Sequence, residues 1–319
     1  MKYHSTGNAD AMAHMTRREF AKTGLLVLGA AATDLGAFAG NVGGLPTVRW
    51  GNHDITRLLL GHNPFKGVAH QTPELGREMK AYFESDATRA VQLMGHCEEL
   101  GFNAFQMGFR PNERLVEKCL RDRKAEGGRF KWIATFYSLP QDGEAAKKEM
   151  QYLLQMDPPP IGVQQMGNTS DLLMRQNKLE LSQDNLKRFR DAGLLVGLGS
   201  HNHEVIDYVA NQGWDLDFYQ CSFYRSMFGL KPQAGGEVFE AADREAMTRV
   251  IRQVPKPCIA FKVLAAGRHC QSAATIEAAL RFAFQNIKPT DVVLLGMWQK
   301  YKDQAAENVA LARKILGAG

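Results

Sequence analysis

Imidazole and ammonium side chains stand at the ends of several short apolar runs in this chain. His62 follows one such run, His201 follows another, and Lys262 ends a third. Two histidines that face one another can act as acid and base or bind a metal ion, and a lysine in this setting can form a Schiff base or hold a phosphate. Hydrogen bonds from the histidines to loop backbone, and a structural ion pair of the lysine, are the alternative interpretations.

Carboxylates are scarce at the ends of the same runs, where only Asp171 lies nearby. A glycosidase of the usual kind needs two carboxyl groups flanking the scissile bond, so this class is disfavoured. With no carboxylate partner evident for either histidine, no metal site is predicted. The abundant amide and cationic groups favour a substrate that carries many oxygens, or the phosphates of a dinucleotide.

Eight short apolar runs predict strands, and segments with helical character lie between them. The predicted strands are 57–60, 104–107, 132–136, 161–165, 194–198, 218–221, 258–262 and 292–295. The clearest predicted helices are 88–100, 144–154, 273–284 and 300–316. Such alternation predicts a parallel sheet closed into a (β/α)8 TIM barrel. No glycine-rich phosphate fingerprint follows the first strand, which disfavours a Rossmann or P-loop domain.

In such a barrel the carboxyl ends of the strands and the loops after them form one rim, where reactive side chains gather. His62, His201 and Lys262 are therefore predicted to meet at that rim, although they lie far apart in the sequence. A long loop, residues 225–240, is expected to cover or line the same site.

The composition disfavours several other classes of protein. The 319-residue chain has a formal net charge of +5, and no cluster of lysine and arginine suggests a nucleic-acid groove. Its five cysteines include no pair with CxxC spacing, so neither a disulfide scaffold nor a thiolate zinc site is predicted. No stretch after residue 40 is long and apolar enough to cross a membrane.

The N-terminal region has the pattern of a twin-arginine export signal. The sequence TRREFAK at 16–22 precedes a mostly apolar run at 24–32, and Ala-Phe-Ala at 37–39 offers a small-x-small cleavage site. Residues 1–39 are therefore predicted to be a signal segment. Residues 40–319 are predicted to be one barrel domain, exported to the periplasm or another extracytoplasmic space. A basic arm before an ordinary buried helix is the alternative interpretation.

From residue 47 onward the chain resembles the aldo-keto reductases in three places. Residues 49–61 are similar to that family's N-terminal hairpin and first barrel strand, and residues 192–220 to the region of its fifth and sixth strands. Residues 261–268, with Gly296 and the segment 303–308, are similar to its last two strands and the helix on the adenosine side. The resemblance implies the same barrel fold.

The resemblance also implies an NADP(H) cofactor and oxidoreductase chemistry on a small carbonyl or sugar substrate. The cofactor-binding positions that it implies are Ser200, Gln220, Arg268, Gln304 and Asn308. His201 stands where the family holds the nicotinamide amide with an asparagine, and Phe223 is the expected stacking aromatic.

The Asp, Tyr, Lys and His with which the family reduces carbonyls, Tyr being the proton donor, have no evident counterparts here. Gln106 and Phe136 stand at the Asp and Lys positions, and the His position falls at Met166 or Gly167. The loop 107–111 contains no tyrosine. Ordinary carbonyl reduction therefore needs another proton donor in this chain.

A missing acid would leave the developing alkoxide unneutralised, and general acid catalysis contributes roughly 10²–10⁴-fold. His62, His201 or Lys262 is expected to replace it. The leading prediction is an exported oxidoreductase with a tightly held nicotinamide cofactor that is loaded before export. The alternatives are a sugar lyase or isomerase that uses His62 and His201 without nicotinamide, and a non-catalytic binding protein.

Overall fold

The computed structural model describes residues 38–42, 44–86, 88–110, 113–225 and 239–317. The chain divides into two units, residues 1–38 and 39–319, and the second is the barrel. Residues 1–37 of the predicted export signal, and all but three residues of the predicted 225–240 loop, lie outside the described residues. The last two residues of that predicted segment, Phe38 and Ala39, belong to strand β1 (Phe38–Val42).

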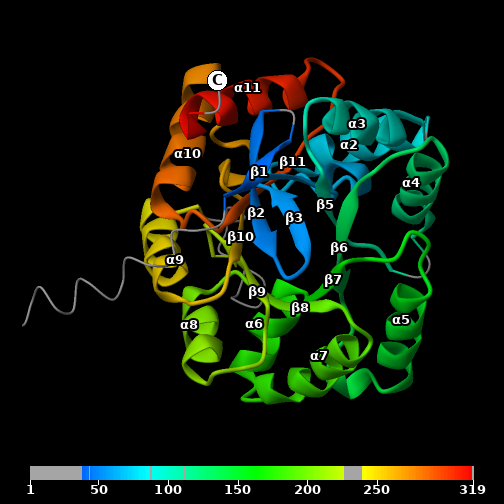
Figure 1. The fold of residues 1–319 in the computed structure, drawn as a ribbon, viewed down its shortest axis with the longest axis vertical. Coiled ribbons are helices and arrows are strands. Elements are labelled where there is room, and N and C mark those ends of the chain that lie inside the picture. Colours follow the sequence, from blue (N-terminus) through cyan, green and yellow to red (C-terminus); the bar gives the residue numbers. More distant parts are fainter. Residues whose placement is uncertain (1–37, 43, 87, 111–112, 226–238, 318–319) are drawn as a thin grey trace, which may run out of the picture. The chain divides into compact units, whose positions relative to one another are not determined.

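Eight parallel strands close into a barrel in the order β10-β11-β4-β5-β6-β7-β8-β9 (Figure 1). They are β4 (Leu58–Gly61), β5 (Ala104–Met107), β6 (Lys131–Phe136), β7 (Gly162–Gln165), β8 (Leu195–Ser200), β9 (Phe218–Ser222), β10 (Cys258–Phe261) and β11 (Val292–Gly296). The predicted TIM barrel is thus confirmed, with strand ends that differ by one or two residues. Most strand residues are buried on both faces of the sheet, which explains the uninterrupted apolar runs.

Helices surround the barrel on the outside (Figure 1). They are α2 (Pro73–Glu84), α3 (Thr88–Glu99), α4 (Arg114–Ala125), α5 (Glu144–Leu154), α6 (Gly167–Arg175), α7 (Ser182–Asp191), α8 (His203–Asn211), α9 (Ala241–Gln253), α10 (Ala273–Asn286) and α11 (Gln304–Leu316). Short 3₁₀ turns are η1 (Asn63–Lys66), η2 (Pro140–Asp142), η3 (Leu179–Leu181) and η4 (Ala265–Gly267).

The last helix begins later than predicted. The Asp303 side chain accepts a hydrogen bond from the backbone N–H of Ala306 and caps α11, which therefore starts at Gln304 and not at residue 300. The other three predicted helices are α3, α5 and α10, within two residues at each end. No helix in the described part of the chain is long and apolar enough to span a membrane.

A hairpin closes the amino-terminal end of the barrel, as the resemblance implied. Strands β1 (Phe38–Val42), β2 (Leu45–Trp50) and β3 (His53–Thr56) form a separate sheet in that order. The Trp50 ring stacks on Phe218 at the start of β9, with ring centroids 5.2 Å apart. Val48 and Ile55 join the same buried cluster, together with residues from six barrel strands. The barrel is therefore filled and covered at this end.

Candidate active site

A cavity of about 860 Å³ lies at the carboxyl ends of the barrel strands. It brings together most of the residues selected from the sequence, namely His62, His201, Lys262, Gln220, Gln304 and Asn308. Among the described residues, Ser200 and Arg268 do not line it. Nor does Phe223, which is fully buried and packs against Phe282 with ring centroids 6.1 Å apart.

His62 follows β4, and both of its ring nitrogens face polar groups. Its Nδ1 lies 3.3 Å from the backbone carbonyl oxygen of Gln106, and its Nε2 lies 3.5 Å from the hydroxyl oxygen of Tyr137. A carbonyl can only accept, so Nδ1 carries the hydrogen and Nε2 is left as an acceptor. Burial, assisted by the Lys66 cation, lowers the pKa of His62 to about 4. The imidazole is therefore neutral at neutral pH.

Tyr137, directly after β6, is a cavity residue that the sequence analysis did not select. Its backbone N–H donates to Glu149 Oε1 at 2.7 Å, and its carbonyl accepts from the Thr169 hydroxyl at 3.1 Å. Lys66 Nζ lies 5.1 Å from the centre of its ring, and the Arg110 guanidinium lies 5.4 Å from it. Burial raises the pKa of the phenol above its usual value, so Tyr137 stays protonated.

The approach of Tyr137 to His62 depends on a glycine. A Cβ atom on Gly108, just after β5, would overlap the Tyr137 hydroxyl and would lie 2.9 Å from His62 Nε2. Neither neighbour can accept that contact without moving. The chain thus leaves room for the tyrosine–histidine pair by having no side chain here.

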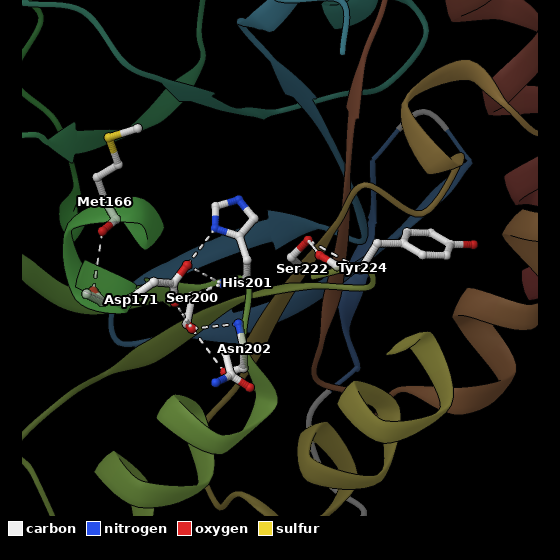
Figure 2. A network of polar contacts seen from close by, with 8 residues as sticks. Met166, Asp171, Ser200, His201, Asn202, Ser222 and Tyr224 are labelled. Atoms are coloured by element: carbon white, nitrogen blue, oxygen red, sulfur yellow. Dashed lines mark hydrogen bonds and ion pairs between the residues drawn. The ribbon is translucent and has the colours of Figure 1, made fainter. Parts of the chain in front are cut away.

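His201, after β8, is paired with Asp171 of α6. The Asp171 carboxylate accepts a hydrogen bond from His201 Nδ1 at 2.9 Å and lies 3.2 Å from the His201 backbone nitrogen (Figure 2). The expectation that neither histidine has a carboxylate partner is therefore wrong for His201. The sequence places Asp171 near the rim but not beside His201, because it comes from the helix after a different strand and only the closed barrel brings the two together.

The pairing fixes which nitrogen of His201 is free to react. Asp171 holds the hydrogen on Nδ1, and the other ring nitrogen lies on the side away from Asp171 (Figure 2). Burial lowers the pKa of His201, and Lys262 lowers it further, although the hydrogen bond to Asp171 opposes this shift. A neutral imidazole that lines the cavity can accept a proton there.

Ser200 supports the same pair. Its hydroxyl donates to Asp171, and it accepts from the Asn202 backbone N–H at 2.9 Å (Figure 2). The side chain is fully buried. The structure therefore places Ser200 behind Asp171 and His201, and does not bring it to the cavity where a cofactor contact was expected.

Lys262 directly follows β10 and has an uncommon backbone conformation. Its φ is +57°, a left-handed value that is rare for residues other than glycine and is typical of functional loops. Its Nζ lies 5.7 Å from the centre of the Phe239 ring. Arg268 follows the same turn, but its guanidinium donates to the carbonyls of His70 and Ala265 at 3.2 and 3.3 Å. Arg268 thus holds the loop in place.

Several buried side-chain oxygens at the cavity have no hydrogen-bond partner. They are Gln164 Oε1, Asn168 Oδ1, Gln220 Oε1 and Asn308 Oδ1. Gln220 is only 6% exposed and Asn308 only 4% exposed. Because buried polar atoms nearly always have a partner, these oxygens favour a ligand with hydrogen-bond donors. Gln304 differs, since its Oε1 accepts from the Trp298 backbone N–H at 3.1 Å.

Among the described residues, no group of three or more histidine, cysteine or acidic side chains is arranged to hold a metal ion. The chemistry that these groups offer by themselves is proton transfer, from two neutral imidazoles, a protonated phenol and an ammonium group.

No family model matches the chain, and no curated protein matches it in sequence. Solved structures do resemble it. A Pseudomonas aeruginosa protein provisionally described as an aldo-keto reductase is 16% identical, with 88% of this chain and 99% of that chain covered and a TM-score of 0.57. The thermostable aldo-keto reductase Tm1743, in complex with the inhibitor epalrestat, is 10% identical over 85% and 98% of the two chains, with a TM-score of 0.53.

A third structure, a mutant of Gox0644 in complex with NADPH, is 10% identical over 86% of this chain and 92% of that chain, with a TM-score of 0.52. At identities of 10–16%, these structural similarities are evidence for the fold alone. They show that the chain has a (β/α)8 barrel of the kind found in solved aldo-keto reductases.

Proposed function

We propose that this protein is an exported, NADP(H)-dependent oxidoreductase that acts on a carbonyl or polyhydroxylated substrate. The observation that carries the proposal is the pair of buried, unpartnered oxygens of Gln220 and Asn308. Both line the cavity, and both are positions that the family resemblance assigns to cofactor binding.

The cavity suits a dinucleotide together with a small substrate. Its volume of about 860 Å³ is near the upper end of the usual range for ligand sites, roughly 300–1,000 Å³. Gln220 can accept from the nicotinamide carboxamide, Asn308 from the adenine amino group, and the Lys262 ammonium can face a phosphate. The cofactor supplies the hydride, and the chain's own residues bind it and move the proton.

A binding measurement tests this directly. Purified full-length protein is titrated with NADPH by isothermal calorimetry and by nicotinamide fluorescence. Gln220→Ala is expected to weaken binding about 2- to 12-fold, because one hydrogen bond contributes roughly 0.5–1.5 kcal/mol. Gln253→Ala, an exposed glutamine at the end of α9, is the matched control and should leave affinity unchanged. Absence of NADPH binding by the unaltered protein would reject the proposal.

A second candidate rests on the Asp171–His201 pair. A neutral imidazole held by a buried carboxylate is a general base, and it can take a proton from a sugar carbon without any nicotinamide. The function would then be that of a sugar isomerase or lyase. Turnover of aldoses by cofactor-free protein, lost in His201→Gln, would favour this candidate. Sugar binding with neither turnover nor NADPH affinity would point to a binding protein.

Export is a separate part of the proposal, and the twin-arginine pattern that supports it lies outside the described residues. The pattern at 16–22 supports a twin-arginine signal. Fusing residues 1–39 to a reporter that must fold before export should send the reporter out of the cytoplasm. Replacement of both Arg17 and Arg18 by lysine should keep it inside.

A further inference from the structure

We infer that the substrate enters this site as a polyhydroxylated alcohol, and that His201 takes the proton of the hydroxyl group that is oxidised. Gln164 and Asn168, which line the same cavity, bind neighbouring hydroxyls of that molecule. The inference deepens the proposed oxidoreductase function and rests on it. The sequence had suggested His201 as a substitute for a missing acid, whereas the structure favours a base.

His201 has the hydrogen-bonding state of a base. Its Nδ1 donates to Asp171, whose carboxylate also accepts from the Ser200 hydroxyl and from the His201 backbone N–H. A neutral imidazole carries one ring hydrogen, so Nε2 of His201 is an acceptor. This nitrogen makes no hydrogen bond to any described residue, and His201 lines the cavity. A ligand that bonds to it must therefore bring the hydrogen.

The His201 ring is held in one orientation before any substrate arrives. Phe261 packs edge-on against it, with ring centroids 5.3 Å apart. The backbone of Gly167 lies so close that a Cβ atom there would be 3.1 Å from the ring. With Asp171 fixing Nδ1, the base loses little further freedom when it reacts.

His62 is not available for the same step. Its Nδ1 donates to the Gln106 carbonyl, and its Nε2 accepts the hydrogen of the Tyr137 hydroxyl. Because that hydrogen is already given to His62, the Tyr137 oxygen can only accept a hydrogen bond from a ligand. This pair therefore also suits a ligand that donates.

The other unpartnered groups of the cavity need donors as well. Among the described residues that line it, every buried side-chain atom without a hydrogen-bond partner is an oxygen. The proposed cofactor contacts account for Gln220 and Asn308, so Gln164 and Asn168 remain for the substrate. An aldehyde or ketone group offers only acceptors, whereas every hydroxyl of a polyol offers a donor. The site therefore fits the alcohol better than the carbonyl compound.

The two amides lie beside the base. Gln164 belongs to β7, which pairs with β8, and His201 directly follows β8. A Cβ atom on Gly199 of β8 would lie 2.5 Å from Gln164 Oε1 and 3.1 Å from the Gly167 nitrogen. Gly167 in turn lies against the His201 ring, and Asn168 is the next residue. One small molecule can therefore reach all three side chains.

The step balances as an oxidation. The substrate O–H bond breaks, its proton moves to His201 Nε2, and its electron pair forms the π bond of the new carbonyl group. The adjacent C–H bond breaks as well, and its electron pair leaves with the hydrogen as hydride to the oxidised nicotinamide. The imidazolium, still bonded to Asp171, then gives the Nε2 proton to water. In the direction of reduction every movement is reversed.

The charges around His201 set the pH range in which it can act. Asp171 stabilises the imidazolium, whereas Lys262 and His70 oppose it, and burial lowers the pKa of His201 below its ordinary value of 6.5. The base is therefore neutral above pH 6.5. The rate of oxidation should fall only on the acid side of that pH.

The decisive experiment compares His201→Gln with the matched control His96→Gln. His96 Nε2 lies 2.8 Å from the Asp303 carboxylate, and this second histidine–aspartate pair lies outside the cavity. With NADP⁺ and either D-sorbitol or 4-nitrobenzyl alcohol, His201→Gln should keep its NADP⁺ affinity and lower kcat about 10²–10⁴-fold. His96→Gln should retain kcat. Loss of NADP⁺ affinity in His201→Gln would show that the histidine binds the cofactor, and would overturn the inference.

Gln164→Met tests the substrate class. It should raise KM for sorbitol about 2- to 12-fold, the effect of one hydrogen bond. KM for 4-nitrobenzyl alcohol, whose single hydroxyl is used by His201, should stay unchanged. Gln253→Met on the exposed surface of α9 is the control and should alter neither value. Equal increases for both alcohols would overturn the assignment of Gln164 to a substrate hydroxyl.

A measurement without cofactor tests the pair itself. In ¹⁵N NMR spectra of the histidine rings at pH 7.5, assigned with His201→Gln, His201 should be the Nδ1–H tautomer. Asp171→Asn should convert it to the Nε2–H tautomer, because the asparagine amide can donate to Nδ1, and should lower kcat as His201→Gln does. An Nε2–H tautomer in the unaltered protein would overturn the inference.

The remaining outcomes separate the inference from the proposed function. NADP⁺ binding with no oxidation of either alcohol, undiminished oxidation by His201→Gln, or turnover that needs no NADP⁺ would each overturn the inference. NADP⁺ binding would still support the proposed function in the first two cases. No binding of NADP⁺ or NADPH by the unaltered protein would remove the proposed function, and the inference with it.

Discussion

The buried His62 imidazole links the stability of the barrel to pH. An unfolded chain protonates this histidine near its ordinary pKa of 6.5, whereas burial in the folded state lowers the pKa to about 4. Unfolding below pH 6.5 therefore takes up a proton. The stabilisation is fully present above that pH, is lost progressively as the pH falls from 6.5 to about 4, and changes no further below the folded-state pKa. Burial lowers the pKa of His201 too, so it adds to the same trend.

Replacing His62 by glutamine should flatten this dependence. A difference of about 2.5 pKa units corresponds to roughly 3 kcal/mol at the acid limit. Urea unfolding at pH 7 and at pH 4.5 measures the change in the free energy of unfolding. The variant should lose less stability than the unaltered protein over this interval. Equal losses in both proteins would show that the imidazole is already charged in the folded state.

At this scale the sequence predicted residue types better than partners. His62, His201 and Lys262 were expected at one rim because each ends or follows an apolar run, and the cavity brings them together. Tyr137 and Asp171 were missed as partners. The contact of Tyr137 with His62 depends on how deep the two side chains lie in the closed barrel. The contact of Asp171 with His201 depends on the position of α6 against the end of β8. Spacing along the chain encodes neither position.

The helices and turns around the cavity depend on close backbone contacts. Gly67, just after η1, has φ +70° and faces Gly76 in α2. A Cβ atom on Gly76 would lie 2.5 Å from the Gly67 carbonyl oxygen. This contact sets the position of α2, whose Leu75 and Met79 line the cavity.

Gly76→Ala should therefore destabilise the protein, although alanine normally stabilises a helix interior by roughly 0.5–1 kcal/mol over glycine. We expect a loss of about 1–3 kcal/mol in the free energy of unfolding, because α2 must move away from η1. Arg77→Ala, at the exposed neighbouring position, should change it by less than about 0.5 kcal/mol. A gain in stability for Gly76→Ala would contradict the packing described.

Helices and strands could be predicted where a single physical property, such as burial on both faces, determines their position in the sequence. Strands buried on both faces read as apolar runs, so all eight could be located from the sequence. The start of α11 could not be located so well, since the charged residues from Lys300 onward suit a helix until the Asp303 cap is seen.

Across the whole molecule, the apolar packing that stabilises the hairpin and the groups that can react lie at opposite ends of the barrel. Aromatic and aliphatic side chains of the hairpin and of the strand beginnings fill one end of the barrel, and polar groups collect at the other. The closed barrel could be predicted from the count of strand–helix units. The reaction could not, because barrels of this kind support many chemistries and side-chain contacts decide among them.

Trp50→Ala tests this separation. Loss of the ring stacked on Phe218 should lower the free energy of unfolding by about 3–5 kcal/mol, the usual cost of removing a large buried aromatic side chain. NADPH affinity at 20 °C should remain within twofold, because the hairpin lies at the opposite end from the cavity. Thermal unfolding and calorimetric titration give the two values. Parallel losses of stability and affinity would show that the ends are coupled.

The hairpin also closes the cavity at the amino-terminal end of the barrel, so that a ligand reaches it from the carboxyl ends of the strands. Gln164 and Gln220 belong to the strands themselves, so a molecule that reaches them must first pass the side chains of the surrounding loops. Two ligands bound one above the other in such a cavity must leave in the reverse order of binding. Under the proposed function, a dinucleotide bound against Gln220 would remain in place while small substrates exchange above it, and retention of this kind is what the proposed export would demand.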